Sequence, residues 1–546
     1  MIAHSPSLIE HYTRLGVWQN ETLLDKIIAN SNRYPNRIAV IDPPNRQELV
    51  GSPAGELDYA ALADAVDRVA AQLLIQGLKP GEIVFAQLPN VLELLVLYYA
   101  VSRAGGVLSA VPVQWRLHEL VMVRKQTGAR ILFTTVFRGF DHLALGRKAG
   151  FQYIYSLDLL TTWMQQPPPE VVFPEINANA TFSLCWTSGT EAEPKGCPLT
   201  HNNWRYQAGL VIEGCRIESG ERILCVAPLV NMTAIGVNFV PALLTAGTLL
   251  LHHPIDIPLL MHQLSKDRIG FTILVPAVLN LIAKQSESAG LDLSSVRTIV
   301  TGSAPPSAWA MREFRRRWDI EVVCVWGQNE GTGLLAGAGD FPDLEARSHQ
   351  FPFWGGPGCR FSQDLTGIES RLDDASGKEV TQIGGIGELV IRGPNLFPGY
   401  FRRPDLDSRS FTADGFFRTG DLFRRVDECR LAFHDRSKDI ILRGGFNISS
   451  AEIETTVLAH PAVADAAAVP VPDPILGERV GVFVVLREAE ATLDLDQLRR
   501  FLTERGFAHN KLPEHLWIIA SIPRNPLGKI IKAKLRESIP IYKPGT

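Results

Sequence analysis

Residues 271–327 read FTILVPAVLNLIAKQSESAGLDLSSVRTIVTGSAPPSAWAMREFRRRWDIEVVCVWG, and this stretch decides the fold. Apolar, β-branched runs predict three strands, at residues 271–275, 297–303 and 321–327. Helical spacing of apolar residues over 277–288, and a helix start at Pro306 and Ser307, predict a helix in each interval. A β-α-β-α-β series predicts an α/β fold with largely parallel sheets flanked by helices.

Two loops follow strands of this series and are the first candidate site loops. They are TGSAPP (301–306) and WGQNEG (326–331). In open parallel sheets, ligands bind at the carboxyl ends of the strands, where both loops fall. The three arginines at 315–317 close the second predicted helix. Cations stabilise the helix dipole there, so these arginines indicate a solvated helix end.

Composition and charge exclude several classes of protein. The chain has 546 residues, 46% hydrophobic and 21% charged, which is typical of a globular protein with roughly two to four domains. The formal net charge is −4, so a nucleic-acid-binding surface, which needs a basic excess, is not expected. The seven cysteines include no CxxC pair, and we expect buried, reduced thiols rather than disulfides or a zinc site.

The N-terminus lacks the basic start and apolar run of a secretory signal. The longest apolar stretch near it, VLELLVLYYAVSRAGG (91–106), is shorter than a bilayer span and contains Glu93. It therefore predicts a core helix. We expect a cytoplasmic protein with no transmembrane segment.

The second half of the chain changes pattern twice. From about residue 384, dense Gly, Pro and Asp predict a turn-rich β section. After residue 436, helical and strand-like segments alternate in a unit of about a hundred residues, the usual size of a small domain. We expect a large N-terminal domain of mainly parallel sheets with a β section, residues 1–435. A hinge would join it to a small α+β C-terminal domain, residues 436–546.

The most informative chemistry lies in FSLCWTSGTEAEPKGCPLTHNNW, residues 182–204. A strand leads into a loop of hydroxyls, glycines and Lys195, and Thr200 is placed to cap a helix near His201. Short donors, free backbone N–H groups and one lysine suit the oxygens and charge of a polyphosphate. The pattern differs from the P-loop GxxxxGK[ST], and an ordinary Ser/Thr turn is the alternative.

Two later residues favour the nucleotide interpretation. Asp421, in TGD (419–421), is suited to accept hydrogen bonds from a ribose diol, with an Asx-turn as the alternative. Lys529, in PRNPLGKI (523–530), lies in a Pro/Gly loop that can direct its side chain into a cleft. The alternative for Lys529 is a solvated surface lysine.

Together these motifs resemble the adenylate-forming superfamily, which includes acyl-CoA synthetases, adenylation domains of peptide synthetases and beetle luciferases. The resemblance runs from about residue 20 to about residue 535. Seven motifs occur in family order and spacing: TSGTEAEPKG (187–196), TGSAPP (301–306), WGQNEG (326–331), GELVIRGPNLFPGY (387–400), TGDL (419–422), DRSKDIILRGGFNISSAEIE (435–454) and PRNPLGKI (523–530).

The resemblance implies the catalytic roles. Lys529 would contact the substrate carboxylate and the α-phosphate, and Glu330 would bind Mg²⁺ against the phosphates. Lys195 would belong to the loop over the β- and γ-phosphates, and Lys438 would be the hinge between the large and small domains.

The resemblance also implies the binding positions. The phosphate loop would include Thr187, Ser188, Gly189 and Thr190. The adenine or acyl pocket and its wall would include Gly302, Ser303, Ala304, Trp326, Gly327, Gln328 and Asn329. Asp421 and Arg436 would hold the ribose, and Gly444 and Gly445 would border the channel for a pantetheine thiol.

The chain departs from the family pattern at several of these positions. Glu191 and Ala192 replace the second Thr and the Gly of the usual TSGTTGxPKG, which removes one hydroxyl and adds a carboxylate. Asn329 replaces the threonine of YGxTE. Asn231 stands where many acyl-CoA synthetases carry a histidine, and some aryl-acid-activating members carry Asn near it. With Trp326 and Gly327 in the pocket, this favours a compact cyclic or aryl acid, and drift in a loop is the alternative.

The expected function is an AMP-forming carboxylic acid:CoA ligase that uses ATP, Mg²⁺ and coenzyme A. One alternative is an adenylating ligase that loads a separate carrier-protein phosphopantetheine. An alternative of another class is a non-catalytic nucleotide-binding homologue, favoured only by the altered phosphate loop. A luciferase-like oxygenase is a third. The acid and the oligomeric state stay open, a homodimer included.

Overall fold

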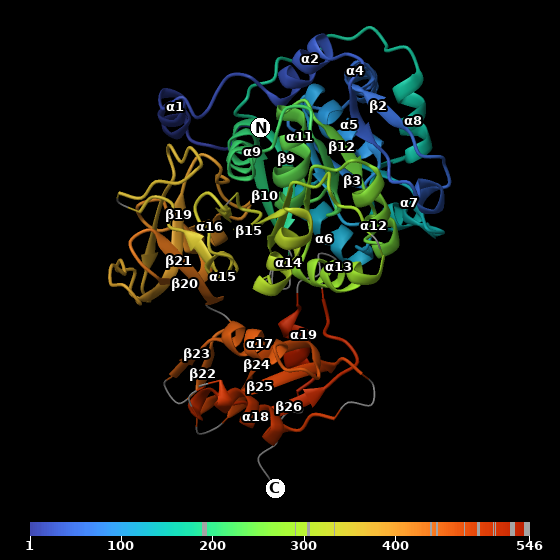
Figure 1. The fold of residues 1–546 in the computed structure, drawn as a ribbon. Coiled ribbons are helices and arrows are strands. Elements are labelled where there is room, and N and C mark those ends of the chain that lie inside the picture. The colour runs from blue at the N-terminus through green and yellow to red at the C-terminus, as the bar shows by residue number, and fades with distance from the viewer. Residues whose placement is uncertain are drawn as a thin grey trace. The chain divides into compact units, whose positions relative to one another are not determined.

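The structure is a computed structural model (Figure 1). It describes residues 1–187, 194–289, 291–302, 306–331, 333–356, 358–436, 439–443, 446–473, 476–488, 492–505, 507, 509–524 and 530–539. The chain divides into two compact units. The first contains Met1–Glu369 and Ile391–Phe417, and the second contains Ser370–Val390 and Arg418–Thr546.

The first unit contains an eight-stranded sheet. Its strands, in spatial order, are β16 (Gly333–Ala336), β15 (Glu321–Gly327), β14 (Thr298–Gly302), β13 (Phe271–Ile273), β11 (Arg222–Cys225), β12 (Thr248–Leu251), β1 (Ile38–Ile41) and β2 (Glu56–Asp58). The six inner strands run parallel, and the two edge strands are antiparallel to their neighbours. The sequence-based expectation of an α/β fold is confirmed.

The predicted β-α-β-α-β series is confirmed in this sheet. β13, β14 and β15 are parallel neighbours, joined by α13 (Pro276–Ala289) and α14 (Ala308–Trp318). Ser307 is the N-cap residue of α14, and the three arginines lie in its last turn. Two of them form ion pairs with Glu313, at 2.7 Å each. They form a helix end, as expected.

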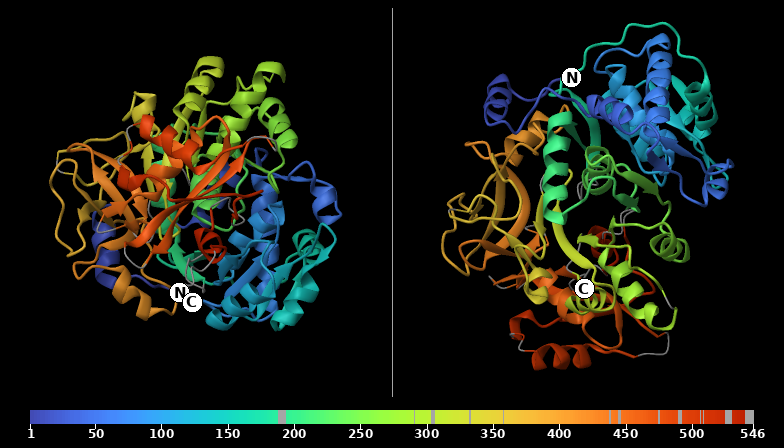
Figure 2. Two further views of the ribbon diagram at one scale, coloured as in Figure 1. Left: turned by 90° about the horizontal axis from the view of Figure 1, so that it is seen from below. Right: turned by 45° about the horizontal axis from the view of Figure 1, so that its top comes forward.

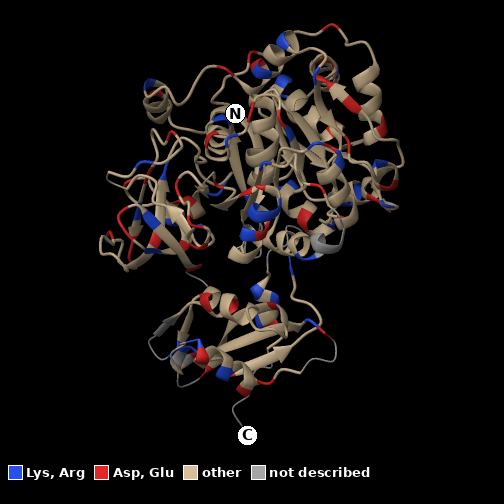
Figure 3. Cartoon of the chain, viewed as in Figure 1, with Lys and Arg blue, Asp and Glu red and all other residues tan. Residues whose placement is uncertain are grey.

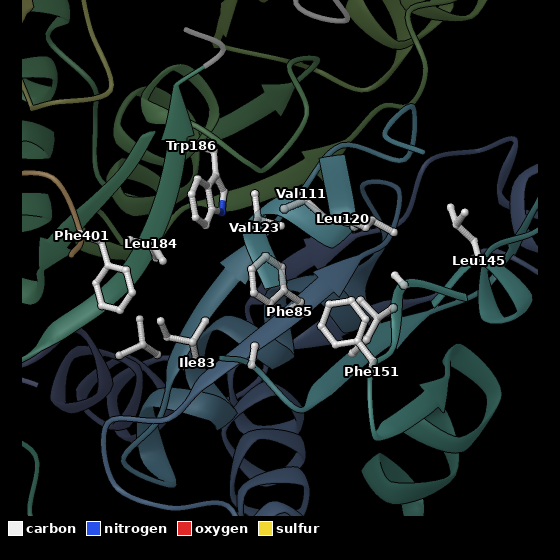
Figure 4. Packing of buried hydrophobic residues seen from close by; sticks show 14 residues of the cluster. Ile83, Phe85, Val111, Leu120, Val123, Leu145, Phe151, Leu184, Trp186 and Phe401 are labelled. Atoms are coloured by element: carbon white, nitrogen blue, oxygen red, sulfur yellow. The ribbon is translucent and has the colours of Figure 1, made fainter. Parts of the chain in front are cut away.

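A second, six-stranded sheet lies in the same unit. Its order is β10 (Lys195–Thr200), β9 (Thr181–Thr187), β4 (Val107–Ala110), β3 (Ile83–Gln87), β5 (Ile131–Thr134) and β8 (Tyr153–Ser156). Only β10 is antiparallel to its neighbour. Figure 4 shows the apolar cluster around this sheet, in which Phe85 of β3 stacks on Trp186 of β9 with ring centroids 6.3 Å apart.

Helices lie beside the strands of both sheets (Figures 1 and 2). The remaining helices of the first unit are α1 (Pro6–Arg14), α2 (Leu23–Arg33), α3 (Arg46–Val50), α4 (Tyr59–Ile75), α5 (Leu92–Arg103), α6 (Leu117–Thr127), α7 (His142–Ala149), α8 (Leu157–Gln165), α9 (His201–Cys215), α10 (Met232–Ala234), a π-helix (Ile235–Phe239), α11 (Val240–Leu244), α12 (Ile257–Lys266), α15 (Leu344–Arg347) and α16 (Pro404–Ser410). Short strands are β6 (Val136–Phe137), β7 (Phe140–Asp141) and β17 (Gln350–Pro352). The predicted core helix is α5, which is buried from Leu92 to Ser102.

The second unit contains a β section together with an α+β section. The β section has the strand order β21 (Arg430–Arg436), β20 (Phe417–Arg425), β19 (Ile386–Arg392) and β18 (Glu369–Asp373). In the α+β section, β25 (Gly477–Leu486) pairs with β22 (Ile441–Arg443), β24 (Val463–Asp473) and β26 (His515–Ile518). Its other elements are β23 (Phe446–Ile448), α17 (Ser450–Leu458), α18 (Leu495–Glu504), a 3₁₀ helix (His509–Lys511) and α19 (Lys532–Glu537).

The cysteines correct one expectation. Five of them are free and buried: Cys185, Cys197, Cys215, Cys225 and Cys324. Cys359 and Cys429 are disulfide-bonded, although reduced thiols were expected throughout. Lone cysteines carry no sequence signal of pairing, because their separation in space is set by the fold.

Two further features of the structure are the length of its helices and the distribution of its charged residues. Among the described residues, none of the helices is long and apolar enough to cross a bilayer. Figure 3 marks basic and acidic residues along the ribbon, and in this view residues of both signs occur along the chain.

Candidate functional site

One edge of the eight-stranded sheet carries many of the candidate residues. β11, β13, β14 and β15 are parallel neighbours, so their carboxyl ends meet at the same edge. Gly302 ends β14, Gly327 ends β15, and Asn231 follows β11. A Cβ atom at Gly302 would lie 2.4 Å from the carbonyl oxygen of Val325. The close approach of these two strand ends therefore requires glycine at position 302.

The candidate phosphate loop connects the two strands of a hairpin. β9 and β10 pair antiparallel, with Thr187 directly opposite Lys195. Trp186, just before Thr187, is buried and donates from Nε1 to Ser109 Oγ at 2.8 Å. The strand that enters the loop is thus anchored in the apolar core. The predicted helix cap that follows is confirmed, because Thr200 Oγ1 accepts from the Asn203 N–H at 3.1 Å at the start of α9.

Glu330, Tyr400 and Lys195 form a cluster beside this hairpin. Glu330 is only 7% exposed, and the Tyr400 hydroxyl donates to Glu330 Oε1 at 2.7 Å. Lys195 Nζ lies 5.4 Å from the centroid of the Tyr400 ring, within cation–π range. Burial and the adjacent Glu330 carboxylate raise the pKa of Tyr400 well above its usual value. Tyr400 therefore stays protonated and keeps its donor.

The backbone around Glu330 is held by the loop that carries Tyr400. The Phe397 N–H donates to the Glu330 carbonyl at 2.8 Å. Gly331 adopts φ 103°, and a Cβ atom there would lie 2.0 Å from the Asn395 carbonyl oxygen. Asn395 is fixed in turn by donating to Gln207 Oε1 at 3.0 Å. Only glycine suits position 331, because both its backbone angle and the close approach exclude a side chain.

Asn329 connects two segments of the candidate site. Its Nδ2 donates to the Trp186 carbonyl at 3.0 Å, and its Oδ1 accepts from the Met232 N–H at 2.9 Å. Asn231 is 5% exposed and caps α10, with its Oδ1 accepting from the Ala234 N–H at 3.2 Å. Both asparagines that depart from the family pattern therefore hold backbone groups in place.

Asp421 and Arg436 face one another in the second unit. They are directly opposed on β20 and β21, and Arg436 Nε lies 3.3 Å from Asp421 Oδ1. Asp421 is 2% exposed and lies within a strand rather than in an Asx-turn. Before it, Gly420 has φ 70° and donates its N–H to Glu388 Oε1 at 2.9 Å. This geometry presents a buried carboxylate and a guanidinium side by side.

The loop that carries Lys529 has fixed ends. Arg524 and Ile530 pair in an isolated antiparallel bridge, and the Ile531 N–H donates to the Pro523 carbonyl at 2.8 Å. Arg524 also forms an ion pair with Asp465 at 2.7 Å. The described residues on either side of positions 525–529 are therefore paired with one another.

Several predicted site residues lie outside the described residues. These are Ser188, Gly189, Thr190, Glu191 and Ala192 of the phosphate loop, Ser303 and Ala304, Lys438, Gly444 and Gly445, and Lys529. Of the other candidates, Thr187, Lys195, Asn231, Gly302, Trp326, Gly327, Gln328, Asn329 and Glu330 belong to the first unit, and Asp421 and Arg436 to the second.

The described residues suit Mg²⁺ bound together with phosphates. Glu330 offers a buried carboxylate, a hard oxygen ligand, in the same cluster as Lys195. No group of three His, Cys, Asp or Glu side chains that could enclose a metal occurs among the described residues. Mg²⁺ commonly takes one or two carboxylates and completes its shell with water and substrate phosphates, so a single carboxylate fits.

Tyr400 is the site residue to which sequence analysis assigned no role. It ends the motif GELVIRGPNLFPGY, and that membership was the available signal. Its hydrogen bond to Glu330 joins residues seventy positions apart, which no local pattern reveals. Trp186 belongs to a predicted apolar strand, and no local pattern indicates that its carbonyl accepts from Asn329 Nδ2.

Two family models and several known proteins match this chain over most of its length. A family model described as AMP-binding enzyme matches residues 28–401, and one described as AMP-binding enzyme C-terminal domain matches residues 452–529. The chain is 30% identical to the vibriobactin-specific 2,3-dihydroxybenzoate-AMP ligase of Vibrio cholerae, covering 97% of this chain and 96% of the relative. It is also 30% identical to the medium-chain fatty-acid–CoA ligase of Escherichia coli, covering 97% and 92% respectively. ATP-bound MatB from Rhodopseudomonas palustris superposes with a TM-score of 0.82 at 26% identity, covering 96% of this chain and all of that one.

Proposed function

The chain belongs to the AMP-binding family of adenylate-forming enzymes, and from this premise we propose that it is an AMP-forming carboxylic acid:CoA ligase. In the first half-reaction, acid and ATP give acyl-adenylate and pyrophosphate. In the second, the thiol of coenzyme A gives the thioester and AMP. The observation that carries the proposal is the buried Glu330, which Tyr400 holds beside Lys195. The chain that contains this cluster matches the AMP-binding family model over residues 28–401 and the model of its C-terminal domain over residues 452–529.

The first half-reaction needs positive charge. An oxygen of the substrate carboxylate attacks the α-phosphorus, and the bond to pyrophosphate breaks. At ~4 Å and an effective dielectric of ~20, each pair of unit negative charges costs about 4 kcal/mol. When bound by Glu330, Mg²⁺ supplies positive charge at the phosphate oxygens. We assign Lys195 to the β- and γ-phosphates and Lys529 to the attacking carboxylate and α-phosphate, so that positioned charge lowers the barrier.

Other residues are assigned to nucleotide binding. The buried carboxylate of Asp421 suits the ribose hydroxyls as a hydrogen-bond acceptor, and Arg436 beside it suits ribose and phosphate oxygens. Adenine and phosphate contacts are assigned to Thr187, Ser188, Gly189, Thr190, Gly302, Ser303, Ala304, Trp326, Gly327, Gln328 and Asn329.

The second half-reaction needs access for a long thiol. The sulfur attacks the acyl carbon, its proton is released, and the bond to AMP breaks. We propose that residues 436–546 form a mobile domain that rotates about Lys438 relative to residues 1–435. Gly444 and Gly445 would then border the pantetheine channel. Domain alternation of this kind is an established way to separate two chemical steps.

A second candidate function is the loading of an aryl acid onto a separate carrier protein. The relative from Vibrio cholerae, named as a 2,3-dihydroxybenzoate-AMP ligase, supports this candidate, and the fatty-acid–CoA ligase of Escherichia coli supports the first. Asn231 also favours a compact aryl or cyclic acid, because it caps α10 and so holds a short polar side chain at the proposed pocket.

Measurement of pyrophosphate release tests both candidates. Short-chain, long-chain, aromatic and alicyclic acids are screened with ATP and Mg²⁺, and the best acid is then supplied with coenzyme A or with a phosphopantetheinylated carrier. Thioester and AMP formed in equal amounts with coenzyme A support the ligase. Thioester formed only on the carrier supports the second candidate. A folded enzyme that releases no pyrophosphate with any acid contradicts both.

A further inference from the structure

We propose that Tyr400 is a positioning residue for the metal-binding carboxylate of Glu330 and for Lys195, holding the first by its hydroxyl and the second by its ring face. The inference rests on the proposed function, because it assigns the Tyr400 contacts to Mg²⁺–ATP binding. It adds a residue to which neither the sequence motifs nor the proposed reaction gives a role.

The hydrogen bond from the Tyr400 hydroxyl orients the carboxylate of Glu330. Tyr400 donates to Oε1 of Glu330 at 2.7 Å, and both side chains are buried, each 7% exposed. A buried carboxylate needs donors, because water no longer solvates it. A donor at one oxygen also restricts rotation of the carboxylate, which orients it for a metal ion. Hydrogen-bond partners of metal ligands typically change metal affinity by about 10- to 100-fold when removed.

The ring contact acts on the other charge of the cluster. Lys195 Nζ lies 5.4 Å from the centroid of the Tyr400 ring. A lysine on a flexible stem loses less entropy on binding a phosphate when an aromatic face already confines it. One side chain therefore touches both charged groups that the proposed function assigns to the polyphosphate.

Tyr400 is itself rigidly placed. Its N–H donates to Asp407 Oδ1 at 2.8 Å, and its ring packs edge-on against Phe397 at 4.9 Å. The preceding Gly399 has φ 140°, and a Cβ atom there would lie 2.7 Å from Asp407 Oδ2. The Asp407 carboxylate and the glycine thus fix the turn from which Tyr400 projects, as a positioning role requires.

Two substitutions separate the two contacts. Tyr400→Phe removes the hydroxyl and keeps the ring, whereas Tyr400→Leu removes both. Tyr206→Phe is the matched control, because the Tyr206 hydroxyl donates to a backbone carbonyl, that of Thr366, at 2.9 Å. Binding of Mn²⁺ in the presence of α,β-methylene-ATP is followed by electron paramagnetic resonance. Binding of the same nucleotide without metal is followed by calorimetry, and unfolding temperatures verify that each variant is folded.

Tyr400→Phe should weaken Mn²⁺ binding by about 10- to 100-fold and leave metal-free nucleotide binding within about twofold. Tyr400→Leu should also weaken metal-free nucleotide binding, by about 2- to 30-fold, the range of a cation–π contact. In a Glu330→Gln background, Tyr400→Phe should cause no further loss of Mn²⁺ affinity, because the carboxylate that Tyr400 positions is already absent. Tyr206→Phe should change neither affinity.

Two results would overturn the inference. One is Mn²⁺ binding by Tyr400→Phe at wild-type affinity. The other is an equal loss of nucleotide affinity with and without metal, which would indicate a structural role only. A wild-type protein that binds Mn²⁺ and nucleotide but never forms pyrophosphate contradicts the proposed function, and the binding experiment still decides the role of Tyr400.

Discussion

Arg46→Met should destabilise the first unit more at pH 8 than at pH 6. Arg46 is 4% exposed and lies between two buried carboxylates. It donates to Asp42 Oδ2 at 2.7 Å and to the two oxygens of Glu93 at 2.6 and 2.8 Å. Methionine fills a similar volume without charge, so the substitution leaves two buried carboxylates facing one another with no cation between them.

The magnitude follows from burial and from the pKa of Asp42. Removing one partner of a buried ion pair costs about 3–5 kcal/mol. Burial raises the pKa of Asp42 from 3.8 to about 6, and the charge of Arg46 opposes that rise. Without Arg46, the pKa of Asp42 in the Arg46→Met variant lies higher still. A carboxyl whose folded pKa is raised stabilises the fold fully below its unfolded pKa and loses that contribution as pH rises through the folded pKa. The loss of unfolding free energy caused by Arg46→Met should therefore be largest near pH 8. It should shrink by up to about 1.4 kcal/mol per pH unit as the pH falls to about 6.

Urea unfolding at pH 6, 7 and 8 measures this difference. Arg14→Met is the matched control, because its partner Glu10 lies in an exposed i,i+4 pair, and it should cost under about 1 kcal/mol at every pH. Adding Asp42→Asn to Arg46→Met should reduce the pH dependence, since one of the two buried carboxyls, that of Asp42, is gone. An Arg46→Met penalty that is independent of pH, or below about 1 kcal/mol at pH 8, would refute the reasoning.

The remaining predictions concern the proposed reaction. Lys529→Ala should abolish acyl-adenylate formation, measured as ATP–pyrophosphate exchange, and spare thioester formation from a supplied acyl-adenylate; survival of both half-reactions would exclude the assigned role. Lys438→Pro should reduce the thiol step more than adenylation when each is measured alone, and equal losses would argue against a hinge there. Asn329→Leu should cost about 1–3 kcal/mol in urea unfolding, because it removes the hydrogen bonds to Trp186 and Met232. It should also raise the KM for ATP, to which Asn329 is assigned, and an unchanged free energy of unfolding would contradict the bridging role.

Local patterns predicted the elements that carry their own signals. The strand 321–327 and the helix that begins after Ser307 are where apolar spacing and capping chemistry place them. The turn-rich β section and the later α+β section also follow from Gly, Pro and Asp density and from alternating periodicity. Each of these signals depends on residues within a few positions of one another, so the sequence displays it directly.

Contacts between distant residues were not predictable in this way. The pairing of Tyr400 with Glu330, the anchoring of Trp186 by Ser109, and the bridging of two segments by Asn329 each join separate parts of the chain. The disulfide-bonded state of Cys359 was missed for the same reason, since cysteine spacing does not encode which thiols meet.

By itself, the sequence determined the α/β class, the order of the strands and helices along the chain, and the residues that resemble an adenylate-forming enzyme. Only the tertiary structure decided how Glu330 is held and why Gly302 and Gly331 have no side chain. The physical reason is that periodicity and capping act over one or two turns of chain. The placement of a buried carboxylate, in contrast, depends on donors that folding brings from elsewhere in the chain.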